Sequence, residues 1–149
     1  MTPATVHASA AVVGGRCVLI RGVSGSGKSS LLLALLTSRD ADATLIADDR
    51  VALDVERGEL IAAAPATIAG LMEIRGVGIV RRDYVARARI DLVVDLMPLA
   101  ECPRLPDEDA ARVHVDGVSL PRIFIAIGAT DGVARVLGAL ASIRAAIVA

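Results

Sequence analysis

Aromatic side chains are almost absent from this sequence. Phe124 and Tyr84 are the only two among 149 residues, and there is no tryptophan. This scarcity argues against recognition by aromatic stacking, as in platforms for single-stranded nucleic acid or cages for quaternary ammonium groups. A basic excess is absent as well, because 16 basic residues stand against 17 acidic ones. We therefore expect no nucleic-acid partner.

The sequence also lacks long hydrophobic runs and signs of secretion. A membrane-spanning helix needs ~20 consecutive apolar residues, and the uncharged stretch at 61–72 contains Pro65 and Gly70. The N-terminus has neither the basic nor the apolar segment of a secretory signal. Cys17 and Cys102 form no CxxC or Cys/His metal pattern, and Cys17 lies in an apolar run where we expect it to be buried. We therefore expect a cytoplasmic protein with no membrane partner.

Lysine is the third scarce residue type. Fifteen of the 16 basic residues are arginine, and the one lysine is Lys28. Arginine and lysine are not interchangeable where a compact ammonium must fit beside phosphate oxygens. Position 28 is therefore a candidate for phosphate binding. The lack of a second lysine also excludes the Asn-Lys-Xaa-Asp motif with which GTPases read guanine.

Apolar residues, in contrast, are plentiful: 54% are hydrophobic and 22% charged. This is enough for the core of one domain, which we take to be residues 1–149 because no repeat or linker divides them. The patterning predicts strands at 16–21, 44–47, 90–96 and 123–127, a hairpin of 51–55 with 60–64, and helices at 29–38 and 130–149. The segment 98–109, rich in proline and acidic residues, is expected to cross the surface. The fold class is therefore α/β, rich in strands.

Residues 22–29 match the P-loop pattern GxxxxGK[ST], between a predicted strand and a predicted helix. Glycines let consecutive backbone N–H groups curl around a phosphate, and the N-terminus of the helix favours the same anion. Lys28 would reach the β- and γ-phosphates, and the Ser29 hydroxyl would ligate Mg²⁺. The predicted nucleotide-binding residues are Gly22, Val23, Ser24, Gly25, Ser26, Gly27, Lys28 and Ser29. We predict a single P-loop domain that binds a nucleoside triphosphate and Mg²⁺.

An acidic pair, Asp48 and Asp49, follows the next predicted strand. In a P-loop protein, a carboxylate there can hold Mg²⁺ directly or through water. It can also accept the proton of a hydroxyl that attacks the γ-phosphate. Adjacent strand residues point to opposite faces, so we expect one of the two to face the site. The alternative is an acidic pair that forms a turn.

Glu73 and Arg75 precede a Gly-Val-Gly sequence. On one extended strand, their carboxylate and guanidinium would face the same way. Gly76 and Gly78 would let the backbone approach a ligand. The alternative is a surface ion pair.

The remaining charged and histidine positions carry weaker signals. The arginines at 81, 82, 87 and 89 are expected to form a solvated face, with a docking surface for an acidic partner as the alternative. Single histidines are usually structural or solvated, which applies to His7 and His114. Arg104 is equally weak when it is considered alone.

The order of these segments resembles the catalytic domain of bacterial HPr kinase/phosphorylase. His7 precedes the loop, and Leu-Ile-Ala-Asp-Asp-Arg-Val at 45–51 and Glu-Ile-Arg-Gly-Val-Gly-Ile-Val at 73–80 follow it. The loop is common to many NTPases, whereas the two later segments are far more specific. The resemblance extends from about Val6 to the C-terminal helix.

The resemblance implies an ATP- and Mg²⁺-dependent kinase that phosphorylates a serine of the phosphocarrier protein HPr, with a fold related to phosphoenolpyruvate carboxykinase. By position, it implies that Lys28 binds phosphate and that Ser29 and Glu73 bind magnesium. Asp49 matches the proton acceptor. His7 and Arg104 match two further active-site residues, and the Arg75, Gly76 and Gly78 positions belong to the family's signature.

This chain also departs from the longer members of that family. Its length leaves no room for their additional N-terminal domain, so we expect a short form. Residues 125–132 stand where longer members carry a Pro-Val-Arg-Pro-Gly-Arg-like segment, associated with removal of phosphate from HPr, but contain no arginine. The reverse phosphorylase activity and the hexameric assembly therefore stay open. Two other interpretations also stay open: a small-molecule kinase and a non-catalytic nucleotide-binding regulatory module.

Overall fold

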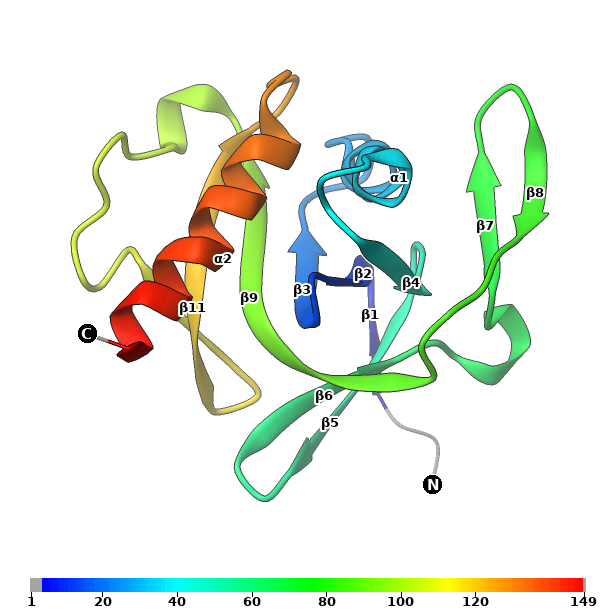
Figure 1. Ribbon diagram of the computed structural model, residues 1–149, viewed down its shortest axis with the longest axis horizontal. Helices are drawn as coiled ribbons and strands as arrows, with labels where there is room; N and C mark the ends of the chain where they lie inside the picture. Colours follow the sequence, from blue (N-terminus) through cyan, green and yellow to red (C-terminus); the bar gives the residue numbers. More distant parts are fainter. Residues whose placement is uncertain (1–3, 149) are drawn as a thin grey trace.

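The computed structural model describes residues 4–148 and the side chains of residues 4–143, so Ala149, the last residue of the predicted C-terminal helix, lies outside them. Two α-helices cover one face of a curved sheet (Figure 1). The helices are α1 (Lys28–Thr37) and α2 (Gly132–Val148). The main sheet contains β1 (Ala4–Val6), β2 (Ala8–Val13), β3 (Arg16–Arg21), β4 (Ala43–Ala47), β5 (Val51–Glu56), β6 (Glu59–Ala63), β9 (Arg87–Met97), β10 (Arg112–Val115) and β11 (Val118–Ala126). A separate hairpin consists of β7 (Leu71–Ile74) and β8 (Gly78–Arg81), and two short 3₁₀ turns lie at Ala66–Ile68 and Leu99–Glu101.

The centre of the main sheet is parallel. Strand β9 lies between β3 and β11 and runs parallel to both, whereas β2 is antiparallel to β3 and β4. Residues 17–20 and 92–96 are buried throughout, as expected for strands covered on both faces. Parallel strands end at the same edge of a sheet, so the ends of β3 and β9 bring Arg21 and Asp95 side by side.

Each face of the sheet has its own apolar core. Leu32 and Leu35 of α1 and Val136 of α2 pack with Ile20 and Val94 on the helical face. On the other face, the core contains side chains of the β5–β6 and β10–β11 hairpins together with Cys17. Among the described residues, no helix is both long enough and apolar enough to cross a membrane.

The Cys17 side chain is buried, as predicted from its apolar run. Burial raises the pKa of its thiol to about 12, with a smaller contribution from the negative charge of Asp91. This thiol is therefore a small apolar group at neutral pH.

Most predicted elements are confirmed within one or two residues at each end. The turn of the predicted hairpin lies at Arg57 and Gly58, which both have positive φ, the geometry that matches the twist of two paired strands. The strands β1, β2, β7, β8 and β10 were not predicted. Residues 123–126 of the strand expected at 123–127 are the end of the longer β11. His114 lies on β10.

Candidate functional site

Residues 22–27, here called the glycine loop, connect the end of β3 to the start of α1. Gly25 and Gly27 have φ values of 81° and 103°, which residues with a Cβ rarely adopt. Within the loop, the Ser26 N–H donates to the Val23 carbonyl at 3.0 Å. Among the described residues, no side chain caps the N-terminus of α1. Its first N–H groups are therefore available to an anion held by the loop.

Lys28 lies across this loop. Its ammonium donates to the carbonyl oxygens of Gly22 at 2.8 Å and Val23 at 3.1 Å, and the residue is only 6% exposed. An ammonium has three donors, so a third N–H remains for a ligand. The loop is also tightly closed, because a Cβ at Gly22 would lie 2.4 Å from Ser26 Oγ. Within the part of the chain that the structure describes, that hydroxyl is buried without a hydrogen-bond partner.

Asp48 links the start of α1 to the end of β4. This aspartate is 7% exposed, and its Oδ1 accepts hydrogen bonds from the hydroxyls of Ser29 at 2.7 Å and Ser9 at 3.1 Å. A hydroxyl has one proton and two lone pairs. Since Ser29 donates its proton to Asp48, its lone pairs stay available to a cation. The oxygen donors and the buried negative charge fit the hard cation Mg²⁺.

The Asp49 side chain contacts a different residue from those that contact Asp48. Its carboxylate is 69% exposed and contacts His7 Nε2 at 2.7 Å. However, both aspartates follow β4 in a bend rather than lying on the strand. Arg50 N–H donates to the Asp48 carbonyl at 2.8 Å around Asp49, whose φ is 70°. A γ-turn of this hand is rare and strained, and such strain is common at functional sites.

The prediction that Glu73 and Arg75 share one face of a strand is wrong. Strand β7 ends at Ile74, and Arg75 lies in the turn before β8. Gly76 and Gly78, with φ values of 85° and 123°, reverse the chain there. The glycines thus shape a hairpin turn, and Glu73 is left exposed on β7.

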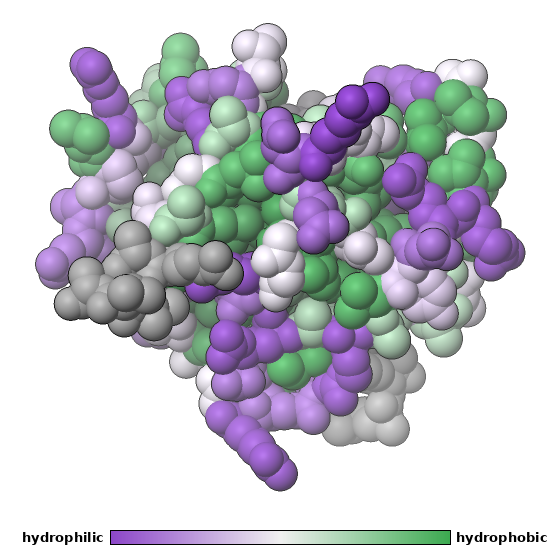
Figure 2. Space-filling model, in the orientation of Figure 1, coloured by the Kyte–Doolittle hydropathy of each residue, from purple (hydrophilic) through white to green (hydrophobic). Residues whose placement is uncertain are grey.

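The structure does not bring Glu73 together with Asp48. Within residues 4–143, no three acidic, histidine or cysteine side chains are grouped closely enough to hold a metal ion. The β7–β8 hairpin stands beside α1 (Figure 1) and exposes apolar side chains along its outer edge (Figure 2). Val77 and Ile79 of this hairpin are 71% and 73% exposed.

Arg104 is likewise separate from the other predicted site residues. It is exposed in the irregular segment between the 3₁₀ turn at Leu99–Glu101 and β10, which crosses the surface as predicted. Among the described residues, its side chain has no hydrogen bond or ion pair with Asp49, His7 or Lys28. This segment is attached to the sheet through Arg122, whose Nε donates to the Ala110 carbonyl at 3.0 Å.

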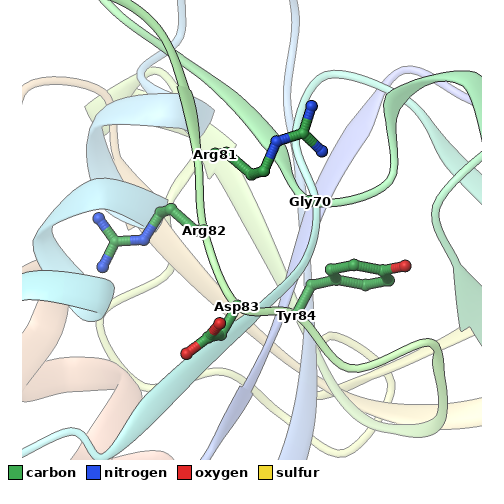
Figure 3. Close-up of a pocket in the computed structure, with 5 residues that line it drawn as sticks. All are labelled: Gly70, Arg81, Arg82, Asp83 and Tyr84. Atoms are coloured by element: carbon green, nitrogen blue, oxygen red, sulfur yellow. The ribbon is translucent and has the colours of Figure 1, made fainter.

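The predicted face of four arginines divides into two pairs. Arg87 is paired with Glu56, and Arg89 with Glu59 and Asp91. Arg81 and Arg82 instead line a shallow pocket of about 700 Å³ with Gly70, Asp83 and Tyr84 (Figure 3). In that pocket the guanidinium groups of Arg81 and Arg82 point away from each other, so they do not converge on one anion.

Sequence reasoning missed Ser9, Arg21 and Asp95. Ser9 is fully buried on β2, and its hydroxyl also accepts a long hydrogen bond, 3.4 Å, from the Asp49 N–H. Asp95 is 7% exposed near the end of β9. An acidic residue inside the apolar run Leu92–Leu96 was a usable signal, since buried carboxylates require partners.

The HPr serine kinase C-terminal domain model matches residues 1–146 of this chain. The chain belongs to this family. HPr kinase/phosphorylase of Geobacillus thermodenitrificans is 37% identical over an alignment of 139 residues that covers 85% of this chain and 44% of that protein. The protein of the same name from Lactiplantibacillus plantarum is 34% identical over an alignment 152 positions long, which covers 92% of this chain and 46% of the relative.

This member of the HPr serine kinase C-terminal domain family therefore spans less than half the length of these curated relatives. A solved structure described as the Hpr(Ser) kinase/phosphatase from Coxiella burnetii aligns with a TM-score of 0.81 and 24% identity. The alignment covers 98% of this chain and 99% of that one. At this identity the likeness shows the fold, which agrees with the predicted strand-rich α/β class.

Proposed function

We propose that this chain is a P-loop kinase domain that transfers the γ-phosphoryl group of ATP, with Mg²⁺, to a serine of the phosphocarrier protein HPr. The observation that carries the proposal is the pair of carboxylates after β4. The Asp48 carboxylate accepts a hydrogen bond from the Ser29 hydroxyl, and the Asp49 carboxylate is exposed and contacts His7. One buried and one accessible carboxylate next to a glycine loop suit metal binding and proton acceptance. Membership of the family supports HPr as the substrate. A reaction of ATP with HPr would take place in the cytoplasm.

In this mechanism the serine Oγ attacks the γ-phosphorus while the bond to the β-phosphate oxygen breaks and ADP leaves. Asp49 accepts the serine proton. Its 69% exposure lets the side chain of a folded protein substrate reach it. The contact between His7 and Oδ1 fixes the carboxylate and leaves Oδ2 for the substrate. His7 is thus a positioning residue for the base.

Lys28 and the N–H groups of the glycine loop hold the triphosphate and stabilise charge on the transferring group. Ser29 and Asp48 would hold Mg²⁺, which neutralises negative charge on the phosphates when it is bound. Glu73 is a candidate magnesium ligand only because of its position in the family's signature. To bind the same ion, it would require the β7–β8 hairpin to approach the glycine loop. For Arg104 to act in the same site, segment 98–111 would also have to approach the loop.

The test is intact-mass analysis of HPr from the same organism after incubation with this chain, ATP and Mg²⁺. We expect a gain of one phosphoryl group, mapped to serine, and no gain with the corresponding serine-to-alanine HPr. Lys28→Ala should abolish transfer and weaken ATP binding. Asp49→Asn should abolish transfer but retain ATP binding, because asparagine tolerates the positive φ and keeps the hydrogen-bonding shape.

Asp54→Asn is the matched control, since Asp54 is an exposed aspartate on β5. It should leave transfer unchanged. Full transfer by Asp49→Asn would remove Asp49 from its role. ATP binding without any mass change of HPr would refute the substrate and favour the small-molecule kinase or the regulatory module. Incubation of the phosphorylated product with excess phosphate would show whether the reverse reaction occurs.

A further inference from the structure

Asp95 is the centre of an ion network at the end of the parallel strands. Arg21 donates to both of its oxygens, from Nε to Oδ1 at 2.8 Å and from Nη2 to Oδ2 at 2.9 Å. Arg122 adds a longer contact from Nη1 to Oδ2 at 3.4 Å. The side chain of Asp95 is 11% exposed, and those of Arg21 and Arg122 are 32% and 19% exposed. One carboxylate thus joins residues of β3, β9 and β11.

The first arginine of this network leads directly into the glycine loop. Arg21 is the last residue of β3 and precedes Gly22, whose carbonyl accepts a hydrogen bond from Lys28 at 2.8 Å. Two parallel N–H···O bonds fix the direction of a guanidinium as well as its distance. Asp95 therefore restrains the strand end from which the loop departs.

The second arginine leads to the segment that carries Arg104. Arg122 Nε donates to the Ala110 carbonyl at 3.0 Å, and its backbone N–H donates to the Ala111 carbonyl at 2.8 Å. The guanidinium also lies over the Phe124 ring, 4.4 Å from its centroid. A stacked, hydrogen-bonded arginine is held in one orientation. Arg122 therefore ties the end of segment 98–111 to the same carboxylate.

A buried ion pair alone is weak evidence for stability, because desolvation offsets the attraction. Arg21 is bidentate to Asp95, whereas Arg122 makes one longer contact to it and is stacked on Phe124. Because the two arginines lead to two different segments, the network fixes the placement of these segments relative to each other. We propose that Asp95 is a positioning residue that holds the glycine loop and segment 98–111 in a fixed relation through Arg21 and Arg122. This inference rests on the proposed function only where it predicts changes in KM, because the placement of the two segments can be tested without activity.

The first test measures amide hydrogen exchange in the chain without substrates, so it needs no turnover. Asp95→Asn should accelerate exchange at least tenfold in both 22–31 and 107–112. Arg21→Gln should accelerate only the first segment and Arg122→Gln only the second. Asp91→Asn is the matched control. Asp91 lies on the same strand and pairs with Arg89 away from the loop, so neither segment should change.

Unchanged exchange in 22–31 and 107–112 in Asp95→Asn would overturn the proposal, and so would identical patterns in the two arginine variants. If Asp95→Asn does not fold, the two arginine variants still decide between these outcomes.

The second test is kinetic and separates the connection through Arg21 from the connection through Arg122. Arg21→Gln should raise KM for ATP about tenfold without changing KM for the protein substrate, and Arg122→Gln should do the opposite. Asp95→Glu should recover part of what Asp95→Asn loses. Equal effects of both arginine variants on kcat alone would contradict the proposal that the two arginines position different segments. If the unaltered chain phosphorylates nothing, the proposed function fails while the exchange pattern still tests the network.

Discussion

The same substitution at two equally buried aspartates should change stability in opposite directions. Asp48 and Asp95 are each 7% exposed. Asp95 has two arginine partners, whereas Asp48 accepts hydrogen bonds from two serine hydroxyls and has no cationic partner among the described residues. We predict that Asp48→Asn stabilises the protein without nucleotide and that Asp95→Asn destabilises it.

The expected magnitudes follow from these partners. At Asp48, two charge-assisted hydrogen bonds become neutral ones, a loss of about 2–3 kcal/mol. Removal of an unpaired buried charge returns a desolvation penalty of several kcal/mol, so the net gain is about 1 kcal/mol. For a domain of this size, that raises Tm by about 2–4 °C. At Asp95, two guanidiniums lose their counterion, which costs about 2–3 kcal/mol after allowance for the partial exposure of Arg21.

Bound Mg-ATP should reverse the order of stability of the unaltered protein and the Asp48→Asn variant. A ligand at 100 times its Kd stabilises the folded state by about 2.7 kcal/mol. If Asp48 helps to hold Mg²⁺, its loss weakens the complex about tenfold or more, which removes about 1.4 kcal/mol of that gain. The variant should therefore be the more stable protein without Mg-ATP and lose this advantage with it.

The assay is chemical and thermal denaturation of the unaltered protein, Asp48→Asn and Asp95→Asn, each with and without Mg-ATP. A loss of more than 1 kcal/mol in Asp48→Asn without ligand would show that the carboxylate stabilises the fold, and would refute the charge argument. An unchanged ligand-induced shift in that variant would separate Asp48 from the metal. Destabilisation of Asp95→Asn provides the internal control, because it shows that the assay detects a lost ion network.

Two further predictions concern the tight packing beneath the loop and the buried thiol. Gly22→Ala should lower stability by about 1–3 kcal/mol, since its Cβ would lie 2.4 Å from Ser26 Oγ; the double variant with Ser26→Ala should recover part of this in denaturant titrations, and additive losses would contradict the clash. Burial raises the pKa of the Cys17 thiol to about 12, so a thiol reagent at pH 8 should modify Cys102 alone in the native chain and both cysteines in denaturant. Because the folded pKa lies above the unfolded one, the stabilising effect of the neutral Cys17 thiol is present below pH ~9 and is lost as pH rises toward 12; a Cys17→Ala variant should not show this loss.

The strands of the parallel centre could be predicted because they are continuous apolar runs bounded by turn residues. Arg16–Arg21 was predicted with the observed bounds. The strand Ala8–Val13 was missed because its alanines carry little strand preference, and only pairing with both β3 and β4 makes it a strand. The β7–β8 hairpin was missed because its turn glycines were attributed to ligand approach.

The candidate site was predictable where spacing along the chain decides the geometry. The glycine loop places Lys28 and Ser29 at the start of a helix, and this follows from the motif alone. The partners of Asp48 and Asp95 depend instead on which strands lie side by side. Ser9 reaches Asp48 across 39 residues, and Arg21 reaches Asp95 across 74. Such contacts follow from sheet order, which local patterns do not specify.

The departures from local stability rules gather at one edge of the sheet. Asp42, Arg57 and Asp116 also have positive φ, but they lie in exposed turns. Asp49 combines positive φ with a contact to His7. Among the residues that the structure describes, its neighbour Asp48 is buried without a cationic partner, and the Ser26 hydroxyl is buried without a hydrogen-bond partner. Selection for stability alone would remove all three features, for example by glycine at 49 and alanine at 26. Their coincidence around the glycine loop supports the view that this edge is shaped for binding and chemistry.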